Sequence, residues 1–80
     1  MNAEDIKALI ATGLSCEHIE VEGDGRHWFA VIVSSAFEGQ GRVQRQRMVN
    51  ATVQAKMATD ELHALSMKTL TPAEWQAAQA

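Results

Sequence analysis

The chain contains one continuous apolar run, WFAVIV at residues 28–33, and this run decides how the surrounding sequence is interpreted. Six residues without polar alternation are typical of a central β-strand that is flanked on both sides. Before it, Ile19 and Val21 alternate with polar and acidic neighbours, as expected of a half-buried strand. The turn-forming residues Gly-Asp-Gly at 23–25 separate the two strands. Together these segments predict a β-hairpin.

Helical signals lie on both sides of the hairpin. Asn2 can cap a first helix in which Asp5 takes the third position, and apolar residues at the i, i+3, i+4 spacing from Ile6 form one buried face. We expect Gly13 to end this helix in a left-handed turn. A long helix is predicted over residues 42–58, which lack Gly and Pro and carry an apolar residue at every fourth position.

The C-terminal part of the sequence predicts a third strand and a last helix. Residues 59–61 break the helical pattern, and apolar residues then alternate from His63 to Met67. Residues 71–74, TPAE, contain a capping box with Pro at the first helical position. The predicted order is therefore α-β-β-α-β-α, an α+β fold. Its three-stranded sheet is mixed, because the hairpin strands are antiparallel while the helical crossover makes the second and third strands parallel.

Length, charge and cysteine content exclude several classes of protein. Eighty residues are too few for a second core, so one domain over residues 1–80 is expected. Cys16 is the only cysteine, which excludes an intramolecular disulfide and favours a reducing compartment. The longest apolar run is far too short to span a membrane. No nucleophile elbow or phosphate-binding loop is present. We therefore expect a cytoplasmic protein that does not bind a membrane and is not an enzyme.

Basic residues are concentrated in the predicted long helix. The formal net charge is −3, so nucleic-acid binding would need a local positive patch. Arg45 and Lys56 fall on one side of an ideal helix, whereas Arg47 lies on another side. Because these residues do not form a single stripe, we interpret them as a solvated surface, with partner docking or nucleic-acid binding as the alternatives.

The predicted topology brings two histidines to one end of the sheet. His27 lies at the start of the second strand and His63 at the start of the third. Neighbouring parallel strands start at the same edge, about 4.8 Å apart, and two neutral imidazoles there can bind a metal. Taken singly, each histidine also fits a solvated or hydrogen-bonded structural role, which we assign to His18. A mononuclear zinc site from Cys16, His18, His27 and His63 has enough ligands, but these residues lack the paired spacing of zinc motifs.

An iron–sulfur cluster is a further candidate for these donors. Such a cluster needs four protein or thiol ligands, usually cysteine thiolates. The chain offers one cysteine and two suitably placed histidines. It cannot enclose a cluster alone.

Four parts of the sequence resemble a known family in their order and spacing. They are VEGDGRHW at 21–28, FEG at 37–39, QRQRMV at 44–49, and HA at 63–64 with KTLTPAEW at 68–75. With these residues the chain resembles the BolA family, and within it the IbaG-like branch, over nearly all its length. The resemblance implies a class II KH-like fold, in agreement with the element order predicted from the pattern.

The resemblance also implies a partner and a cofactor. BolA-like proteins pair with monothiol glutaredoxins around a shared [2Fe-2S] cluster, for which a glutaredoxin cysteine and glutathione supply sulfur ligands. His63 matches the family's C-terminal ligand histidine, and His27 matches a loop position that is histidine in one branch. Another branch has a cysteine a few residues earlier, where this chain has Asp24 or Gly25. The implied function is non-catalytic cluster trafficking or sensing in iron–sulfur and iron homeostasis, with apo iron–sulfur proteins as further partners and a link to stress response.

Four other residues in the matching segments are assigned to the fold and to partner docking. We expect Gly39 to give backbone freedom before the long helix, Phe37 to anchor the core, and Arg45 and Arg47 to make surface contacts. The alternative function is a KH-like nucleic-acid-binding transcriptional regulator. A KH module clamps nucleic acid with a Gly-x-x-Gly loop, however, and this chain has only Gly-Gln-Gly and Gly-Asp-Gly.

Overall fold

The apolar run at residues 28–33 is the central strand of a three-stranded sheet. The computed structural model describes the backbone of residues 1–79 and the side chains of all of these except residues 59 and 60; residue 80, the last of the expected domain, lies outside this range. Strand β1 (His18–Gly23) pairs antiparallel with β2 (Trp28–Val33). Strand β3 (Leu65–Leu70) pairs parallel with the other edge of β2. The mixed sheet predicted from the sequence is thus confirmed.

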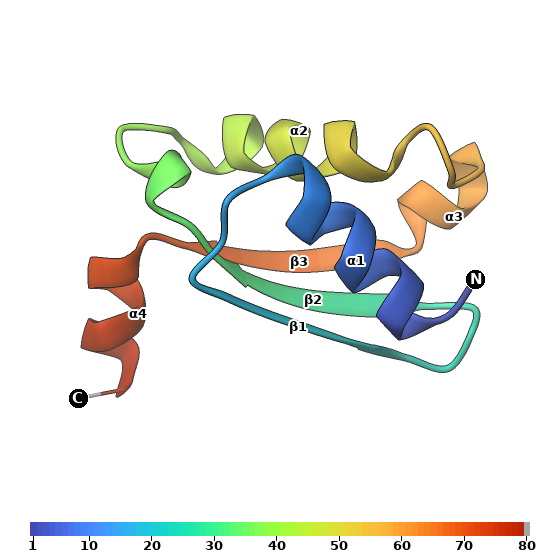
Figure 1. The fold of residues 1–80 in the computed structure, drawn as a ribbon, viewed down its shortest axis with the longest axis horizontal. Coiled ribbons are helices and arrows are strands. Elements are labelled where there is room, and N and C mark those ends of the chain that lie inside the picture. Colours follow the sequence, from blue (N-terminus) through green and yellow to red (C-terminus); the bar gives the residue numbers. More distant parts are fainter. Residues whose placement is uncertain (80) are drawn as a thin grey trace.

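The helices are arranged on one face and at the two ends of this sheet (Figure 1). Helices α1 (Ala3–Gly13) and α2 (Arg42–Val53) cover one face. The short helix α3 (Thr59–His63) lies where β3 begins, and α4 (Pro72–Gln79) follows the end of β3. A single 3-10 turn, η1 (Ser35–Phe37), joins β2 to the segment before α2. The order α-β-β-α-β-α is confirmed, with η1 and α3 as short additions. No helix in the described part of the chain is long and apolar enough to cross a membrane.

The predicted cap at Asn2 and the predicted capping box at residues 71–74 are both present, and the first is also a full capping box. The Asn2 side chain accepts the Asp5 N–H at 2.9 Å, and the Asp5 carboxylate accepts the Asn2 N–H at 3.0 Å. At α4, the Thr71 hydroxyl accepts the Glu74 N–H at 3.1 Å, while the Glu74 carboxylate accepts the Thr71 N–H at 2.8 Å. Each box satisfies backbone donors that a helix start leaves without partners.

The core lies between the helical layer and the covered face of the sheet. Phe37 is the largest fully buried side chain, and its burial stabilises the fold by about 2–3 kcal/mol. The helical residues predicted to face inward do so. The other large, fully buried apolar side chains are Ile6, Ile10, Ile32, Val33, Val49 and Val53.

The helix predicted over residues 42–58 is wrong at its C-terminal end. Helix α2 stops at Val53, whose carbonyl oxygen accepts the N–H groups of both Lys56 and Met57 at 3.0 Å. This turn redirects the chain toward the sheet and still places Met57 in the core, with 4% of its surface exposed. The apolar residue at every fourth position therefore marks buried residues, and the last of them, Met57, lies beyond the end of the helix.

The alternation of residues predicted that His63 begins the third strand, and this prediction is wrong. Residues 59–63 form α3 instead of a break followed by a strand, and β3 starts at Leu65. The Glu61 carboxylate accepts the Ala58 N–H at 3.0 Å, which caps this short helix. The apparent alternation from His63 thus joins the last residue of a helix to the first residues of a strand.

Gly13 does not adopt the left-handed conformation that we predicted. It is the last residue of α1 and is followed by extended Leu14; among the described glycines only Gly25 and Gly39 have a positive φ. Gly13 instead allows close packing of two helices. A Cβ at this position would lie 2.8 Å from Cγ2 of Thr52 in α2.

Within residues 1–79, no helical layer covers the second face of the sheet over most of its length (Figure 1). Strand β2 has a strand on each side, as predicted, but its apolar run does not reflect burial of both faces. Phe29 is 41% exposed, and Val31 is only partly buried. The side chains of Trp28, Ala30 and Ile32 point to the covered face.

Gly23 ends β1 at a position that has no room for a side chain. A Cβ there would collide with the His27 carbonyl oxygen and the Trp28 ring. We expect Gly23→Ala to lower the free energy of unfolding, measured by urea denaturation, by about 2 kcal/mol or more because of this overpacking. Gly41→Ala is the control, since a Cβ at Gly41 has no neighbour within 4 Å. Equal losses in the two variants would contradict the prediction.

Candidate functional site

The first residues of β2 and β3 meet at one end of the sheet, and both candidate ligand histidines lie there. Trp28 is in register with Leu65, and the Trp28 N–H donates to the Ala64 carbonyl oxygen at 2.9 Å. His27 immediately precedes Trp28, and His63 immediately precedes Ala64. The parallel topology therefore places His27 and His63 at the same end, as predicted; we call this pair the histidine rim.

Both side chains of the histidine rim are exposed. His27 belongs to the loop between β1 and β2, whereas His63 is the last residue of α3. His63 was predicted to lie in a strand, which is wrong, but it still lies at the end of the sheet because Leu65 starts β3 two residues later. The rim consequently presents two imidazoles to solvent or to a partner.

Asp24 fixes the loop that carries His27. Its carboxylate accepts the N–H groups of Arg26 at 2.8 Å and of His27 at 2.9 Å. The hydrogen bond from the His27 backbone, followed by that from Arg26, lowers the pKa of Asp24. Gly25 supplies the left-handed backbone of this loop with φ +93°. The loop before His27 thus holds a carboxylate that is engaged in local hydrogen bonds.

Among the side chains that the structure describes, none joins the histidine rim as a third metal ligand. The described residues contain no group of three or more His, Cys, Asp or Glu side chains that could hold a metal ion. His18 pairs with Val33 at the far end of β1, and Cys16 precedes it. A six-residue strand is about 17 Å long from end to end. The alternative of a mononuclear zinc site built from Cys16 and all three histidines is therefore wrong.

Cys16 has the environment of a structural thiol. It is partly buried, and its Sγ donates to the Leu14 carbonyl oxygen at 3.3 Å. Burial, with a smaller effect from the Glu17 carboxylate, raises the pKa of the thiol. The thiolate, which is the nucleophilic form, is accordingly disfavoured at neutral pH.

His18 links β1 to the last helix. Its ring stacks on Trp75 of α4 with 4.7 Å between the ring centroids and 17° between the planes. Its Nε2 lies 2.6 Å from Oε2 of Glu20, which lies on the same side of β1. The contact with Trp75 joins residues far apart in the sequence, so no local pattern could reveal it.

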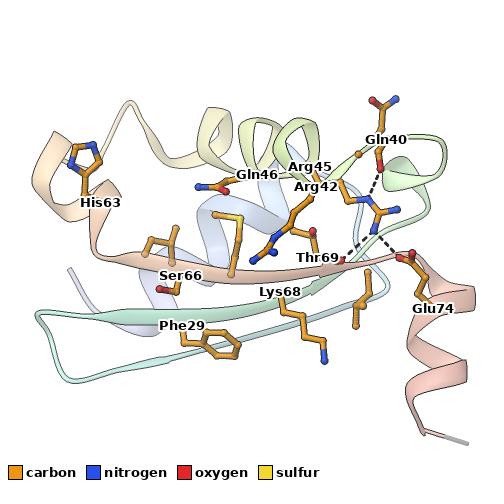
Figure 2. A pocket seen from close by; sticks show the side chains of 14 residues that line it. Phe29, Gln40, Arg42, Arg45, Gln46, His63, Ser66, Lys68, Thr69 and Glu74 are labelled. Atoms are coloured by element: carbon orange, nitrogen blue, oxygen red, sulfur yellow. Dashed lines mark hydrogen bonds and ion pairs between the residues drawn. The ribbon is translucent and has the colours of Figure 1, made fainter.

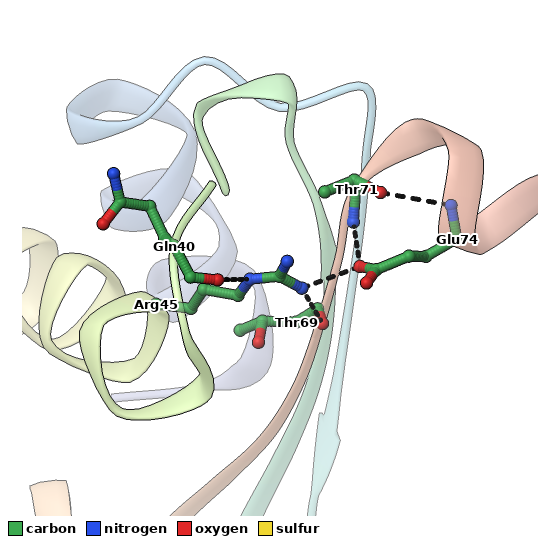
Figure 3. A network of polar contacts seen from close by, with 5 residues as sticks. All are labelled: Gln40, Arg45, Thr69, Thr71 and Glu74. Atoms are coloured by element: carbon green, nitrogen blue, oxygen red, sulfur yellow. Dashed lines mark hydrogen bonds and ion pairs between the residues drawn. The ribbon is translucent and has the colours of Figure 1, made fainter. Parts of the chain in front are cut away.

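Arg45 holds the opposite end of the sheet together, which agrees with its assignment to the fold, while its part in partner docking stays a prediction. Its side chain is only 14% exposed. Figure 3 shows its guanidinium at the centre of a network: Nε donates to the Gln40 carbonyl oxygen at 2.8 Å, and Nη1 donates to Thr69 O at 3.2 Å and Glu74 Oε1 at 2.7 Å. The guanidinium carbon also lies 5.8 Å from the centroid of the Phe37 ring.

The remaining two residues from the matching segments differ in exposure and backbone. Arg47 is exposed on α2, and its role in docking stays a prediction. Gly39 has φ +76°, a conformation that glycine adopts at little cost, in the segment between η1 and α2. This agrees with the backbone freedom expected there.

A groove of about 940 Å³ runs along the outer edge of β3 from the histidine rim to α4. His63 lies at one end, and Glu74 lies at the other (Figure 2). Arg42 and Gln46 extend from α2 toward β3, while Lys68 lies on the other side of the strand. The groove was not predicted from the sequence, because neither edge of the sheet was identified as open.

The fold and the histidine rim define a KH-like α+β domain with two exposed imidazoles at one end of its sheet. A family model described as BolA-like protein matches residues 5–74. The chain therefore belongs to the BolA-like family.

Its relatives include characterised and solved members of this family. The acid stress protein IbaG of Escherichia coli (strain K12) is 35% identical over 75 residues, which cover 94% of this chain and 89% of IbaG. Human BolA-like protein 2 is 34% identical over 80 aligned residues, with coverage of 94% and 91%. The structure of a bolA protein homologue from Coxiella burnetii is 43% identical with a TM-score of 0.82, covering 95% and 97% of the two chains.

Because of the ion pair between Arg45 and Glu74, we expect the free energy of unfolding to depend on pH in the acidic range. The hydrogen bond from Arg45, followed by that from the Thr71 backbone, holds the pKa of Glu74 below its ordinary value. A lowered folded-state pKa stabilises the fold at neutral pH, and this contribution disappears as the pH falls through that pKa. Glu74→Gln should therefore be less stable than wild type at neutral pH, with a smaller further loss between roughly pH 5 and 3. Urea denaturation of both proteins across this pH range checks the prediction. If Glu74→Gln lost stability on acidification as steeply as wild type, the prediction would be contradicted.

Proposed function

We propose that this chain acts with a monothiol glutaredoxin to hold a [2Fe-2S] cluster, with His63 and His27 as its ligands, in the trafficking or sensing of clusters for iron–sulfur and iron homeostasis. The observation that carries the proposal is the parallel register of β2 and β3, which brings two exposed imidazoles to one rim. Membership of the BolA-like family supports it, because the family resemblance implies this partner and this cofactor.

The number of donors at the rim supports a shared site. A cluster of this type needs four ligands, and the described residues offer two imidazoles without a third suitable side chain beside them. A glutaredoxin cysteine and the thiolate of glutathione would supply the remaining two. Exposure of both histidines leaves the rim accessible to such a partner. The proposal therefore explains why the described residues supply only half of a ligand set at the rim.

The cluster would supply electron transfer or transferable iron and sulfide, and the protein's part is to present donors to it. Asp24 holds the backbone at His27 through two hydrogen bonds. The α3 helix and the start of β3 hold the backbone at His63. Replacing two thiolates by imidazoles raises the reduction potential of such clusters, as in Rieske centres. The chain would thus adjust the cluster that its partner brings.

Nucleic-acid binding is the alternative, and the groove beside β3 is the observation in its favour. Arg42 and Lys68 are exposed there. Arg45 contributes little free charge, because it is paired with Glu74. A regulator of this kind would bind an oligonucleotide with an affinity that falls steeply with salt.

Substitution of the rim histidines tests the ligand assignment. We expect the wild-type chain to give visible absorption and circular dichroism only when it is reconstituted without oxygen with a monothiol glutaredoxin and glutathione. His63→Ala and His27→Ala should each abolish or shift these bands, because each removes one donor. His18→Gln is the matched control, since His18 lies at the far end of the sheet. Spectra that stay unchanged in both rim variants would exclude these residues as ligands.

Acid should dissociate the shared cluster. An imidazole nitrogen binds iron only when it is unprotonated, so protonation competes with ligation. We expect the visible circular dichroism of the complex to disappear as the pH falls through the titration range of imidazole, with far-ultraviolet circular dichroism as the control for folding. Retention of the visible signal throughout that range would contradict the prediction that the cluster is acid-labile.

A further inference from the structure

The outer edge of β3 presents free backbone groups. At the inner edge, Trp28 and Ser34 donate N–H groups to the carbonyl oxygens of Ala64 and Leu70 at 2.9 and 3.0 Å. Backbone groups alternate in direction along a strand, so the even-numbered residues of β3 face β2 and Met67 directs its N–H and C=O outward. Within residues 1–79, no strand pairs with this outer edge.

A hydrogen bond from Arg45 confirms that the backbone groups of odd-numbered β3 residues point outward. It also occupies the outer edge of β3 at Thr69. Nη1 of Arg45 donates to the carbonyl oxygen of Thr69, two residues beyond Met67, at 3.2 Å. Leu65 and Met67 both line the groove, and no described residue forms a hydrogen bond with their outward backbone groups. The edge is therefore occupied at Thr69 and open from Leu65 to Met67, on the side of the histidine rim.

Positive charge flanks the open part of the edge. Arg42 extends from α2 on one side of β3, and Lys68 lies on the other side (Figure 2). Both side chains are exposed, and neither takes part in an ion pair with a described residue. The acid that lines the groove, Glu74, is already paired with Arg45. The groove thus combines two cationic side chains with backbone N–H and C=O groups of β3 that have no hydrogen-bond partner among the described residues.

We propose that the β3 edge binds an extended acidic segment of a partner protein as a fourth strand of the sheet. Addition of a strand to an exposed edge is an established mode of peptide recognition, in which main-chain hydrogen bonds give affinity and alternate side chains give specificity. Successive side chains of the added strand would point to opposite sides. Acidic residues at neighbouring positions would therefore reach Arg42 on one side and Lys68 on the other.

A peptide fits this edge better than a nucleic acid does. The outward groups of Leu65 and Met67 alternate donors with acceptors, which matches another polypeptide backbone. Two exposed cations would neutralise few phosphates, and the sequence lacks the Gly-x-x-Gly clamp. A second copy of this chain is a further occupant to test, because the free edge of β1 carries Glu20 and Glu22. Such head-to-tail pairing would produce growing chains of molecules.

The test uses the isotopically labelled chain alone, without iron, glutathione or glutaredoxin, so its outcome is independent of cluster binding. The probe is a blocked eight-residue peptide with the repeat Glu-Glu-Val-Val, which places acids on both sides of a strand. We expect saturable shifts in the amide spectrum, and at least tenfold slower hydrogen exchange at the Leu65 and Met67 amides when the peptide is bound. A Lys-Lys-Val-Val peptide and an oligothymidylate of equal length are the comparison probes.

Variants separate the proposed contacts from general effects of charge. Lys68→Glu and Arg42→Glu should each weaken binding of the acidic peptide by about fivefold or more. Lys56→Glu is the matched control, because Lys56 is exposed but does not line the groove. Met67→Pro should also weaken binding, since it removes an outward N–H and leaves the hydrogen bonds to β2 in place.

Several results would overturn the proposal. They are absence of binding at about 1 mM peptide, protection confined to other amides, equal affinity in Lys68→Glu and Lys56→Glu, and tighter binding of the oligonucleotide or the basic peptide. Sedimentation of the chain alone could give a further contradicting result. A mass that grows with concentration, together with protection of the β3 amides, would show that a second copy of the chain occupies the edge.

Discussion

The pairing of β2 with β3 is the constraint on which the remaining features depend. The hydrogen bond from Trp28 to Ala64 sets the register, and the helical crossover through α2 sets the parallel direction. Together they bring His27 and His63, which have 35 residues between them in the sequence, to one rim. The same register directs alternate backbone groups of β3 outward along the groove. Ligand presentation and the open edge are thus consequences of one strand pair.

The two ends of the sheet have different chemistry. At the end where β3 meets α4, Arg45 joins a loop, a strand and a helix through hydrogen bonds to Gln40, Thr69 and Glu74, and His18 stacks on Trp75 nearby on α4. At the other end the described side chains form few such links, and the histidine rim is exposed. Cross-links that stabilise the fold are therefore separate from the donors proposed for iron. A substitution at the rim can change ligation without removing the contacts that hold the sheet to α4.

The fold could be predicted where the signals were local. The central apolar run, the cap at Asn2, the capping box at residues 71–74 and the crossover rule predicted the element order, and parallel strands then placed both histidines at one end. The contacts that were missed join distant residues: Arg45 binds Glu74, His18 stacks on Trp75, and Gly13 packs against α2. Periodicity reports which side of an element is buried, but not which partner lies against it. The end of α2 and the α3 helix were missed because burial continued past the point where the helix stopped.

Ligation by this chain is tested most directly by pulsed electron paramagnetic resonance of the reduced complex. The chain would carry nitrogen-15 in its histidines, and the glutaredoxin and glutathione would be unlabelled. The shared-cluster proposal predicts strong nitrogen-15 couplings from two imidazoles, one lost in His63→Ala and the other in His27→Ala, with none lost in His18→Gln. A reduced cluster that shows no coupling to the labelled histidines would contradict it.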